Sequence, residues 1–558
     1  MSQYQAHSST INHTTLFPKQ DSQWWQNAVI YQIYPRSFQD SNNDGIGDLQ
    51  GIIQRLDYIA ALNVDAIWIS PFFQSPMADF GYDISDYRQV DPLFGSLDDF
   101  DQLLAQAHAR GLRVIIDQVL SHTSDQHAWF KESRSATDND KTHWYVWADA
   151  KADGTPPNNW LSIFGGSAWQ WDPRRQQYYL HNFLSSQPDL NLHNPALRKQ
   201  LLEEVEFWLK RGVDGLRLDA IVHCFHDQQL RDNPARPEEM AHNKGCKPDN
   251  PYAAQLHTYS ADRPENLAFI EQLRALLDRY PGTISLGEVS SDDSLATIGR
   301  YTLGNHRLHT AYCFELLSDE VSAQFLRNTA LTLTKATNNG WPCWAIGNHD
   351  SERVISRWGN GGDQGTQAAM LTALITSMRG PICLYQGDEL GLPESDVPYE
   401  QLQDPYGKEF WPNFKGRDGC RTPMPWDQNL THAGFSETNS WLPIDEKHYP
   451  LSVEQQHQDK HSTLNRVRHF LAWRRQQPAL QHGDIHFIES EEPILIMQRC
   501  CDKQQLIACF NLSNSQQTIH LPACNNLYAL DEVALNTFTL NGVQLELPPY
   551  GVFYAQYD

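Results

Sequence analysis

The stretch GLRLDAIVH, residues 215–223, places an arginine and an aspartate two positions apart in an otherwise apolar run. Alternate residues of a strand point to the same side, so Arg217 and Asp219 are expected to lie next to each other. Taken alone, the pair reads best as a buried ion pair that joins two elements. Such pairs stabilise a fold only weakly, however, because removing both charges from water is costly. A functional role therefore has to be weighed against the rest of the chain.

Seven further short apolar runs, rich in Val and Ile, are similar to the strand predicted at 215–219. They lie at 29–38, 66–70, 113–119, 284–289, 311–316, 343–350 and 382–390. Amphipathic segments such as 97–111 and 195–212 separate them, and the second of these ends in Arg-Gly, which is typical of a helix end. Fully apolar runs suit parallel strands that are covered on both faces. The sequence thus predicts an α/β fold, a (β/α)₈ TIM barrel.

Two regions depart from regular strand-helix alternation. The segment after the third strand is too long, and too rich in Trp, Asn and Gly, for a simple crossover, and from about residue 482 the chain turns to short alternating strands. A second excursion follows the eighth strand and is expected to cover the barrel mouth. The predicted divisions are barrel 1–120, an inserted small domain 121–187, barrel 188–480 with a subdomain at about 391–430, and a C-terminal antiparallel β-sandwich 481–558.

Composition limits the classes of function. With 558 residues, of which 40% are hydrophobic, the chain can bury a large core. A net charge of −25 without a sustained basic run argues against a nucleic-acid partner. The N-terminus has no signal-peptide pattern, no window approaches the roughly 18 apolar residues of a membrane span, and the ten cysteines include no C-x-x-C pair. We therefore expect a cytoplasmic protein that binds a small ligand, with no nucleic-acid or membrane partner.

Polar residues stand at the ends of most predicted strands. These are Asp117, His122, Arg217, Asp219, Glu288, His349 and Asp350. The active sites of such barrels lie at the carboxyl ends of the strands. Any one of these residues alone is better explained as structural, but their convergence on one rim favours catalysis.

Four motifs carry a resemblance to a known family. DQVLSH (117–122), GLRLDAIVH, LGEV (286–289) and AIGNHD (345–350) resemble the four conserved regions of the α-amylase family, glycoside hydrolase family 13. QPDLN (187–191) resembles the additional region of its oligo-1,6-glucosidase and α-glucosidase branch. The likeness runs from about residue 22 to the C-terminus.

The resemblance implies a retaining mechanism with two carboxyl groups about 5–5.5 Å apart. It makes Asp219 the nucleophile, Glu288 the acid/base and Asp350 a third catalytic carboxylate that binds sugar hydroxyls. Arg217 would then lower the pKa of Asp219 and keep the nucleophile ionised.

The resemblance also implies a substrate pocket. His122 and His349 would bind hydroxyls and Tyr82 would stack beneath the sugar ring, with Phe164 and Phe183 beside it. Asp79 and Arg417, rather than Arg421, match the pair that closes the pocket behind the non-reducing glucose.

Three further positions bear on specificity. Val222 and Ser121 replace a lysine and a calcium-binding asparagine that are common in α-amylases proper, which argues against endo action. Ala220, directly after the nucleophile, resembles the small residue of α-1,4-glucosidases rather than the valine of oligo-1,6-glucosidases.

The loop DSNNDGIGD, residues 40–48, spaces oxygen ligands in a manner similar to an EF-hand loop, although it lacks the preceding helix and the final glutamate. The alternative is a hydrogen-bonded turn. By resemblance, Asp40, Asn42, Asp44, Asp48 and the carbonyl of Ile46 would bind a structural Ca²⁺ or Mg²⁺, and no organic cofactor is expected.

The sequence therefore predicts an exo-acting retaining α-glucosidase. It would release α-glucose from the non-reducing end of short α-glucosides, prefer maltose-type α-1,4 links, and transfer glucose to alcohol or sugar acceptors. A sucrose hydrolase, an oligo-1,6-glucosidase or a trehalose-synthase-like isomerase would share nearly all these residues. A non-catalytic sugar-binding or transporter-associated scaffold of the same fold would have lost the carboxylates and gained a membrane helix.

Overall fold

Eight parallel strands form the centre of the protein. The structure is a computed structural model that describes residues 22–240, 245–247, 249–521, 526–530, 533, 535 and 538–557. The central strands are β1 (Val29–Ile33), β2 (Ala66–Ile69), β5 (Arg113–Val119), β9 (Gly215–Asp219), β10 (Ile284–Val289), β11 (Thr310–Cys313), β12 (Trp344–Ala345) and β13 (Ile382–Tyr385). They pair in the order β11-β10-β9-β5-β2-β1-β13-β12, and the Cys343 N–H donates to the Ala311 carbonyl at 3.0 Å where β12 meets β11. The predicted (β/α)₈ barrel is confirmed, and seven strands lie inside their predicted runs, while β11 begins one residue earlier, at Thr310.

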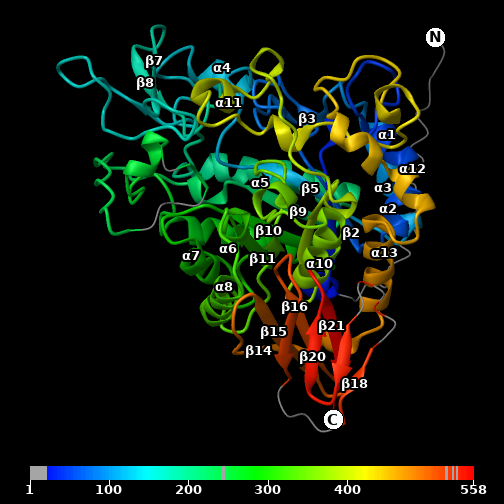
Figure 1. Ribbon diagram of the computed structural model, residues 1–558. Helices are drawn as coiled ribbons and strands as arrows, with labels where there is room; N and C mark the ends of the chain where they lie inside the picture. Colours follow the sequence, from blue (N-terminus) through cyan, green and yellow to red (C-terminus); the bar gives the residue numbers. More distant parts are fainter. Residues whose placement is uncertain are drawn as a thin grey trace.

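The described helices lie around the strands or, in the insertion and the second excursion, above them (Figure 1). They are α1 (Leu49–Gln54), α2 (Leu56–Ala61), α3 (Leu97–Ala109), α4 (Ala128–Ser133), α5 (Pro195–Arg211), α6 (Asn266–Leu277), α7 (Ser294–Thr302), α8 (Ala323–Ala336), α9 (Val354–Arg357), α10 (Gln364–Thr376), α11 (Pro405–Phe410), α12 (Val453–Gln458), α13 (Thr463–Arg474) and α14 (Pro478–His482). Helix α5 shows why these segments are helical. The Asn194 side chain accepts from the first free N–H groups, Pro195 suits the first position, and Gly212 ends the helix at φ +102°.

β1, β12 and β13 are the strands that fall furthest short of their predicted runs. β1 ends at Ile33 because Pro35 begins a 3₁₀ helix, Pro35–Ser37. β13 ends at Tyr385 because Gly387, at φ +94°, turns the chain into another 3₁₀ helix, Asp388–Leu390. β12 keeps only two residues, since the chain after Ala345 leaves the sheet toward the mouth. Because β12 is short, His349 and Asp350 lie beyond the strand, at the barrel mouth.

The insertion after β5 carries its own small sheet. β6 (Trp147–Ala148), β8 (Gln177–Leu180) and β7 (Trp169–Asp172) pair antiparallel. A second small antiparallel sheet, of β3 (Phe73–Gln74) and β4 (Asp86–Val90), comes before β5 in the chain. Figure 1 shows β7 and β8 above the barrel, with α11 of the second excursion near them. The inserted antiparallel structure agrees with the predicted fold class, while the domain boundaries given above stay predictions.

Two antiparallel sheets form the C-terminal part. The first has the order β14-β15-β16-β21-β18 and the second the order β17-β20-β19. Their bounds are β14 (Asp484–Ile488), β15 (Ile494–Cys501), β16 (Gln504–Asn511), β17 (Gln517–His520), β18 (Tyr528–Ala529), β19 (Thr539–Asn541), β20 (Gln544–Leu547) and β21 (Val552–Gln556). Ile507, Leu545 and Phe553 belong to one buried apolar cluster that joins the two sheets. Within the described residues, no helix is long and apolar enough to cross a membrane.

Candidate active site

Arg217 lies at the centre of a group of buried carboxylates. Its guanidinium is 2.7 Å from Asp117, 2.8 Å from Asp219 and 2.7 Å from Glu288, and its side chain is fully buried. The three carboxylates come from the adjacent strands β5, β9 and β10, whose register sets Asp117 opposite Arg217. The two opposite charges of the opening stretch therefore belong to a set of one cation and three carboxylates.

Burial dominates the protonation of this set. It raises the pKa of Asp219 to about 7 although Arg217 acts in the opposite direction, and it raises the pKa of Glu288 to about 7 in the same way. Arg217 lowers the pKa of Asp219, as the sequence predicts, but burial outweighs this effect and the net pKa is raised, because one guanidinium is shared among three buried carboxylates. Near neutral pH the two groups titrate as a pair that can hold one proton between them. One ionised carboxylate beside one carboxylic acid is what a retaining glycosidase needs.

The chain turns sharply after the Asp219 carboxylate. Ala220 has φ +39° and ψ +42°, in the left-handed region, and the 3₁₀ helix Ile221–His223 follows. The Ala220 N–H donates to Glu288 Oε2 at 3.0 Å. The turn that ends β9 therefore fixes the carboxyl group carried by β10.

A further buried carboxylate, Asp350, lies in the segment that follows β12. It lies 3.2 Å from His349, 3.2 Å from Arg417 and 2.7 Å from Arg421. Burial acts to raise the pKa of Asp350, but His349 and the two arginines outweigh it and hold the pKa well below its usual value. Asp350 is therefore an ionised acceptor for hydroxyl groups. The Tyr82 ring stacks on His349, with ring centroids 5.5 Å apart.

One end of the site is closed by a network around Arg417. Its Nη2 donates to Asp79 at 2.8 Å and to Asp404 at 2.7 Å, and its guanidinium carbon lies 5.1 Å from the centre of the Phe164 ring. Gln187, from the stretch 187–191, donates to Asp79 at 3.2 Å. Of the two arginines considered from the sequence, Arg417 contacts Asp79, while Arg421 donates to Asp350 and to the His349 carbonyl.

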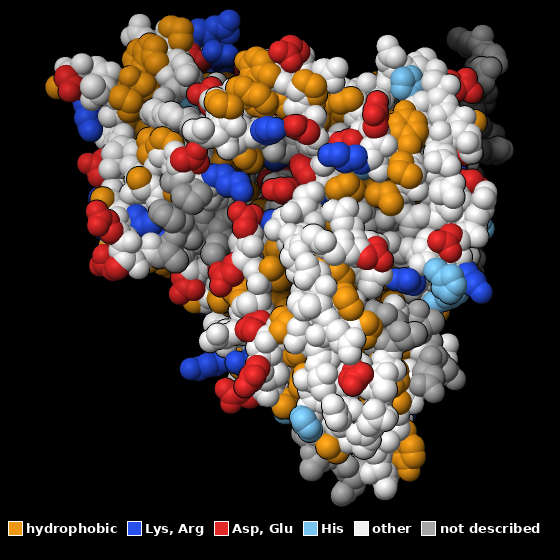
Figure 2. All heavy atoms as spheres, in the orientation of Figure 1, with side chains coloured by type: hydrophobic (Ala, Val, Ile, Leu, Met, Phe, Trp, Pro, Cys, Tyr) orange, Lys and Arg blue, Asp and Glu red, His pale blue; other side chains and the backbone are white. Residues whose placement is uncertain are grey.

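These groups line one cavity of about 110 Å³ at the barrel mouth. Figure 2 shows acidic and basic side chains around a hollow in the upper half of this face. Ten of the twelve predicted catalytic and substrate-binding residues line the cavity: Asp79, Tyr82, His122, Phe164, Phe183, Asp219, Ala220, Glu288, Asp350 and Arg417. The other two lie behind this wall, Arg217 against the carboxylates and His349 against Tyr82.

Some lining residues were not predicted from the sequence. Ile163, His223, Gly245, Ser290, Phe314 and Tyr406 also line the cavity. His223 had a signal, since it ends the opening stretch four positions after Asp219. Burial lowers the pKa of His223 to about 3, and its Nδ1 has no hydrogen-bond partner among the residues that the structure describes. Tyr406 had no such signal in the sequence, because it belongs to the segment after β13, which has no regular hydrophobic periodicity.

The loop 40–48 lies apart from these carboxylates and folds on itself. The Asp40 carboxylate accepts from the Asn42, Asn43 and Gly45 N–H groups, and Asp44 accepts from the Ile46 N–H. Oxygen donors of this kind fit a hard cation such as Ca²⁺ or Mg²⁺. Over the described ranges, no three or more His, Cys, Asp or Glu side chains come close enough to hold a metal ion. The Asn42 amide and the Ile46 carbonyl would therefore have to complete any ligand set.

Comparison with known proteins places this barrel and site in a family. The model of the α-amylase catalytic domain matches residues 32–483. The chain therefore belongs to the α-amylase family, glycoside hydrolase family 13.

Individual relatives show which enzymes of the family the chain is similar to. A probable alpha-glucosidase of Rhizobium meliloti (strain 1021) is 52% identical, over 98% of this chain and 100% of that protein. An oligo-1,6-glucosidase of Heyndrickxia coagulans is 35% identical, over 90% and 95% of the two chains. The crystal structure of the alpha-glucosyl transfer enzyme XgtA is 57% identical and superposes with a TM-score of 0.94, covering 96% of this chain and 99% of that one. The protein is a glycoside hydrolase of the α-glucosidase type that acts on α-glucosides.

Proposed function

We propose that the protein is an exo-acting, retaining α-glucosidase that removes α-glucose from the non-reducing end of short α-glucosides and also transfers it to alcohols or sugars. The observation that carries exo action is the contact of 2.8 Å between Asp79 and Arg417 at one end of a small cavity. An end closed by a charged pair leaves room for one terminal sugar and none for a chain that continues beyond it.

The proposed reaction has two steps. Asp219 attacks the anomeric carbon while Glu288 donates its proton to the leaving oxygen, which gives a β-linked glucosyl ester on Asp219. Glu288, now a carboxylate, then takes a proton from water as the water oxygen attacks the same carbon and the ester bond breaks. Two inversions restore the α configuration. An alcohol or sugar hydroxyl can replace water, and the similarity to XgtA, an alpha-glucosyl transfer enzyme, supports this second outcome.

Asp350 and the pocket residues would favour the transition state over the ground state. The developing positive charge at the sugar ring is attracted to ionised Asp350, which at the same time accepts hydroxyl hydrogen bonds. His122 and His349 are held neutral, since burial lowers the pKa of each below its usual value. They can therefore act as hydrogen-bond partners without adding positive charge beside the oxocarbenium ion.

A preference for maltose-type links rests on Ala220. It lines the cavity beside Asp219, and a methyl side chain leaves room for an α-1,4-linked leaving sugar. Discrimination by a methylene group is worth about 1–3 kcal/mol, so a preference of roughly tenfold is expected.

The loop 40–48 is proposed to bind a structural Ca²⁺ or Mg²⁺ through Asp40, Asn42, Asp44, Asp48 and the Ile46 carbonyl. Its backbone also holds the segment after residue 434, since the Trp441 N–H donates to the Gly45 carbonyl at 3.0 Å. A bound cation would stiffen this junction without contacting the catalytic carboxylates.

A substrate panel tests the proposed function. Purified protein should hydrolyse maltose faster than isomaltose, with sucrose and trehalose poorer, and its rate should fall as maltooligosaccharides lengthen. The first product seen by NMR before mutarotation should be α-glucose. A β-glucose product would contradict the retaining mechanism, and rising rates on long chains would contradict exo action.

A further inference from the structure

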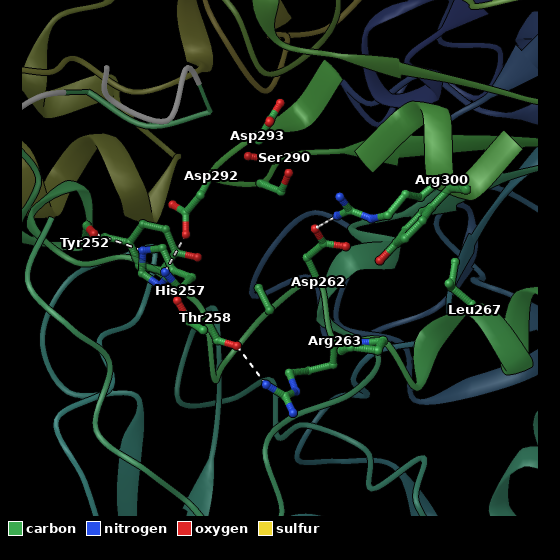
Figure 3. A pocket seen from close by; sticks show the side chains of 14 residues that line it. Tyr252, His257, Thr258, Asp262, Arg263, Leu267, Ser290, Asp292, Asp293 and Arg300 are labelled. Carbon is green, nitrogen blue, oxygen red and sulfur yellow. Dashed lines mark hydrogen bonds and ion pairs between the residues drawn. The ribbon is translucent and has the colours of Figure 1, made fainter. Parts of the chain in front are cut away.

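A second cavity lies beside the catalytic pocket, on the loops that follow the two strands carrying Asp219 and Glu288. We call it the rim cavity. It measures about 440 Å³ and is lined by Tyr252, His257, Thr258, Ala261, Asp262, Arg263, Pro264, Leu267, Ser290, Ser291, Asp292, Asp293, Arg300 and Tyr301. Figure 3 shows the 257–267 side of this wall across from residues 290–293 and 300. A volume of about 300–1,000 Å³ is typical of sites for small ligands.

Most of the charged side chains of the rim cavity have an ion-pair partner, either inside the cavity or outside it. Asp262 pairs with Arg300, and Asp292 pairs with Arg236 while accepting from the His257 N–H at 2.7 Å. Arg263 lies 3.6 Å from Asp227, which is outside the cavity. A lining of paired charges offers both donors and acceptors without a strong net potential, which suits a neutral polyhydroxylated ligand. An anionic ligand would face three aspartates against two arginines.

Apolar groups complete the lining. The Tyr252 and His257 rings stack with centroids 3.6 Å apart, and Ala261, Pro264 and Leu267 add aliphatic surface. A pyranose presents hydroxyl groups at its edge and C–H groups on its faces, so it needs a mixture of this kind. The composition of the cavity therefore matches one sugar ring.

The rim cavity and the catalytic pocket share Ser290, two residues after Glu288. Gly245 lines the catalytic pocket and Tyr252 lines the rim cavity, so the same connection after β9 contributes to both. The closed end at Asp79 and Arg417 is formed by other segments. The two cavities thus adjoin at Ser290, on the side of the catalytic pocket that the connections after β9 and β10 form.

We propose that the rim cavity is an acceptor site that binds the distal ring of a disaccharide acceptor while the proximal ring is glucosylated. The inference rests on the proposed glucosyl transfer. In that step an acceptor hydroxyl attacks the anomeric carbon of the glucosyl–Asp219 ester. The new C–O bond forms, the ester C–O bond breaks, and the hydroxyl proton passes to the Glu288 carboxylate.

Two variants of the rim cavity test the inference with α-glucosyl fluoride as donor, because its leaving group is too small to reach the cavity. Arg300→Ala removes a cation whose side chain is 48% exposed. Thr258→Trp adds bulk to the lining from an exposed position, and the Thr258 carbonyl, which accepts from Arg263, is kept by the substitution. Arg279→Ala is the matched control, an exposed arginine after α6 that lines neither cavity.

The readout is transfer to maltose compared with transfer to methanol and glucose. We expect the maltose concentration at half-maximal transfer to rise about tenfold in both cavity variants, as loss of charged hydrogen bonds or of space requires. Fluoride hydrolysis and transfer to the small acceptors should stay within about twofold of wild type, as should every activity of Arg279→Ala.

The outcomes separate the two proposals. Unchanged use of maltose in both variants, or an equal loss with maltose and methanol, would overturn the acceptor site while leaving the glucosidase intact. Absence of fluoride release by the wild-type protein would instead overturn the proposed function itself.

Discussion

Asp219 and Glu288 lie at similar distances from the Arg217 guanidinium, so their environments alone do not show which is the nucleophile and which is the acid/base. Substitution of each residue distinguishes the two roles. Asp219→Asn should remove nearly all turnover on every substrate, because an amide cannot form the glucosyl ester. Glu288→Gln should lower maltose hydrolysis by roughly 10²–10⁴-fold, the usual contribution of general acid catalysis, with less effect on the first step with α-glucosyl fluoride. Initial rates on both substrates check this. Equal impairment of Glu288→Gln on maltose and fluoride would reverse the assignment.

The raised pKa of Glu288 also predicts a pH dependence of stability. The carboxyl has a pKa of about 7 in the folded protein against an ordinary value of 4.5, so the folded state holds the proton more tightly than the unfolded state. Ionising Glu288 therefore destabilises the fold, an effect absent below pH 4.5 and complete above pH 7. Glu288→Gln should raise the melting temperature at pH 8 and leave it nearly unchanged at pH 4.5. The exposed Glu203→Gln is the control, and a Glu288→Gln shift that does not grow with pH would contradict the reasoning.

Ala220 links backbone geometry to linkage choice. Ala220→Val should shift the ratio of kcat/KM for maltose and isomaltose about tenfold toward isomaltose. A β-branched residue at φ +39° is strained by roughly 1–3 kcal/mol, so the variant should also lose stability. The ratio of kcat/KM for maltose and isomaltose, measured at a temperature where the variant is folded, therefore decides the question. The rate on either sugar alone does not, because it also falls when the variant unfolds. An unchanged ratio would mean that Ala220 does not set the preference.

At the scale of elements, the hydrophobic pattern predicted the positions of strands and helices, because these depend on local sequence. Buried parallel strands are apolar on both faces, so all eight were located, and helices such as α5 carry their caps in the sequence. The ends of β1 and β13 were overestimated, because a proline and a left-handed glycine overrule the apolar pattern. Motif residues of the site were identified from their resemblance to the family's conserved regions, which are short stretches of sequence. Contacts made by the excursions, such as Tyr406, depend on long-range packing that has no periodic signal.

The loop 40–48 gives a prediction for one element. If it binds Ca²⁺ or Mg²⁺, removing the ion should lower the melting temperature, and a concentration 100-fold above Kd should restore about 2.7 kcal/mol of unfolding free energy. Asp44→Asn should abolish this response while keeping the turn, because Asp44 is exposed and an amide oxygen can still accept from the Ile46 N–H. Asp149→Asn, at another exposed position, should respond as wild type does. Scanning calorimetry after chelation measures both, and a melting temperature indifferent to chelator and to added ion would contradict the site.

At the scale of the whole molecule, the barrel and the C-terminal sheets share one core. Met497, Phe510 and Tyr554 of the sheets belong to the same buried apolar cluster as Leu374 of α10 and Phe470 of α13. The Tyr554 hydroxyl also lies within hydrogen-bond distance of Ser377 Oγ. A continuous core of this kind should unfold as one unit, so the catalytic rim and the C-terminal sheets are expected to lose structure together.

A substitution of Arg499 tests whether the barrel and the C-terminal sheets unfold together. Its buried guanidinium donates to the carbonyls of Ser377, Met378, Leu480 and Gly483, which joins β15 to the end of α10 and to α14. Burial lowers the pKa of Arg499 to about 9, which leaves it charged at neutral pH. Arg499→Met leaves four carbonyls without their donor, and at about 1–3 kcal/mol for each unsatisfied buried group the loss should reach several kcal/mol. We expect one calorimetric transition, shifted to lower temperature, with kcat on maltose unchanged well below it. Lys503→Met, an exposed substitution after the same strand, should shift nothing. Two separate transitions in Arg499→Met, with activity lost only in the second, would show instead that the C-terminal sheets fold independently of the barrel.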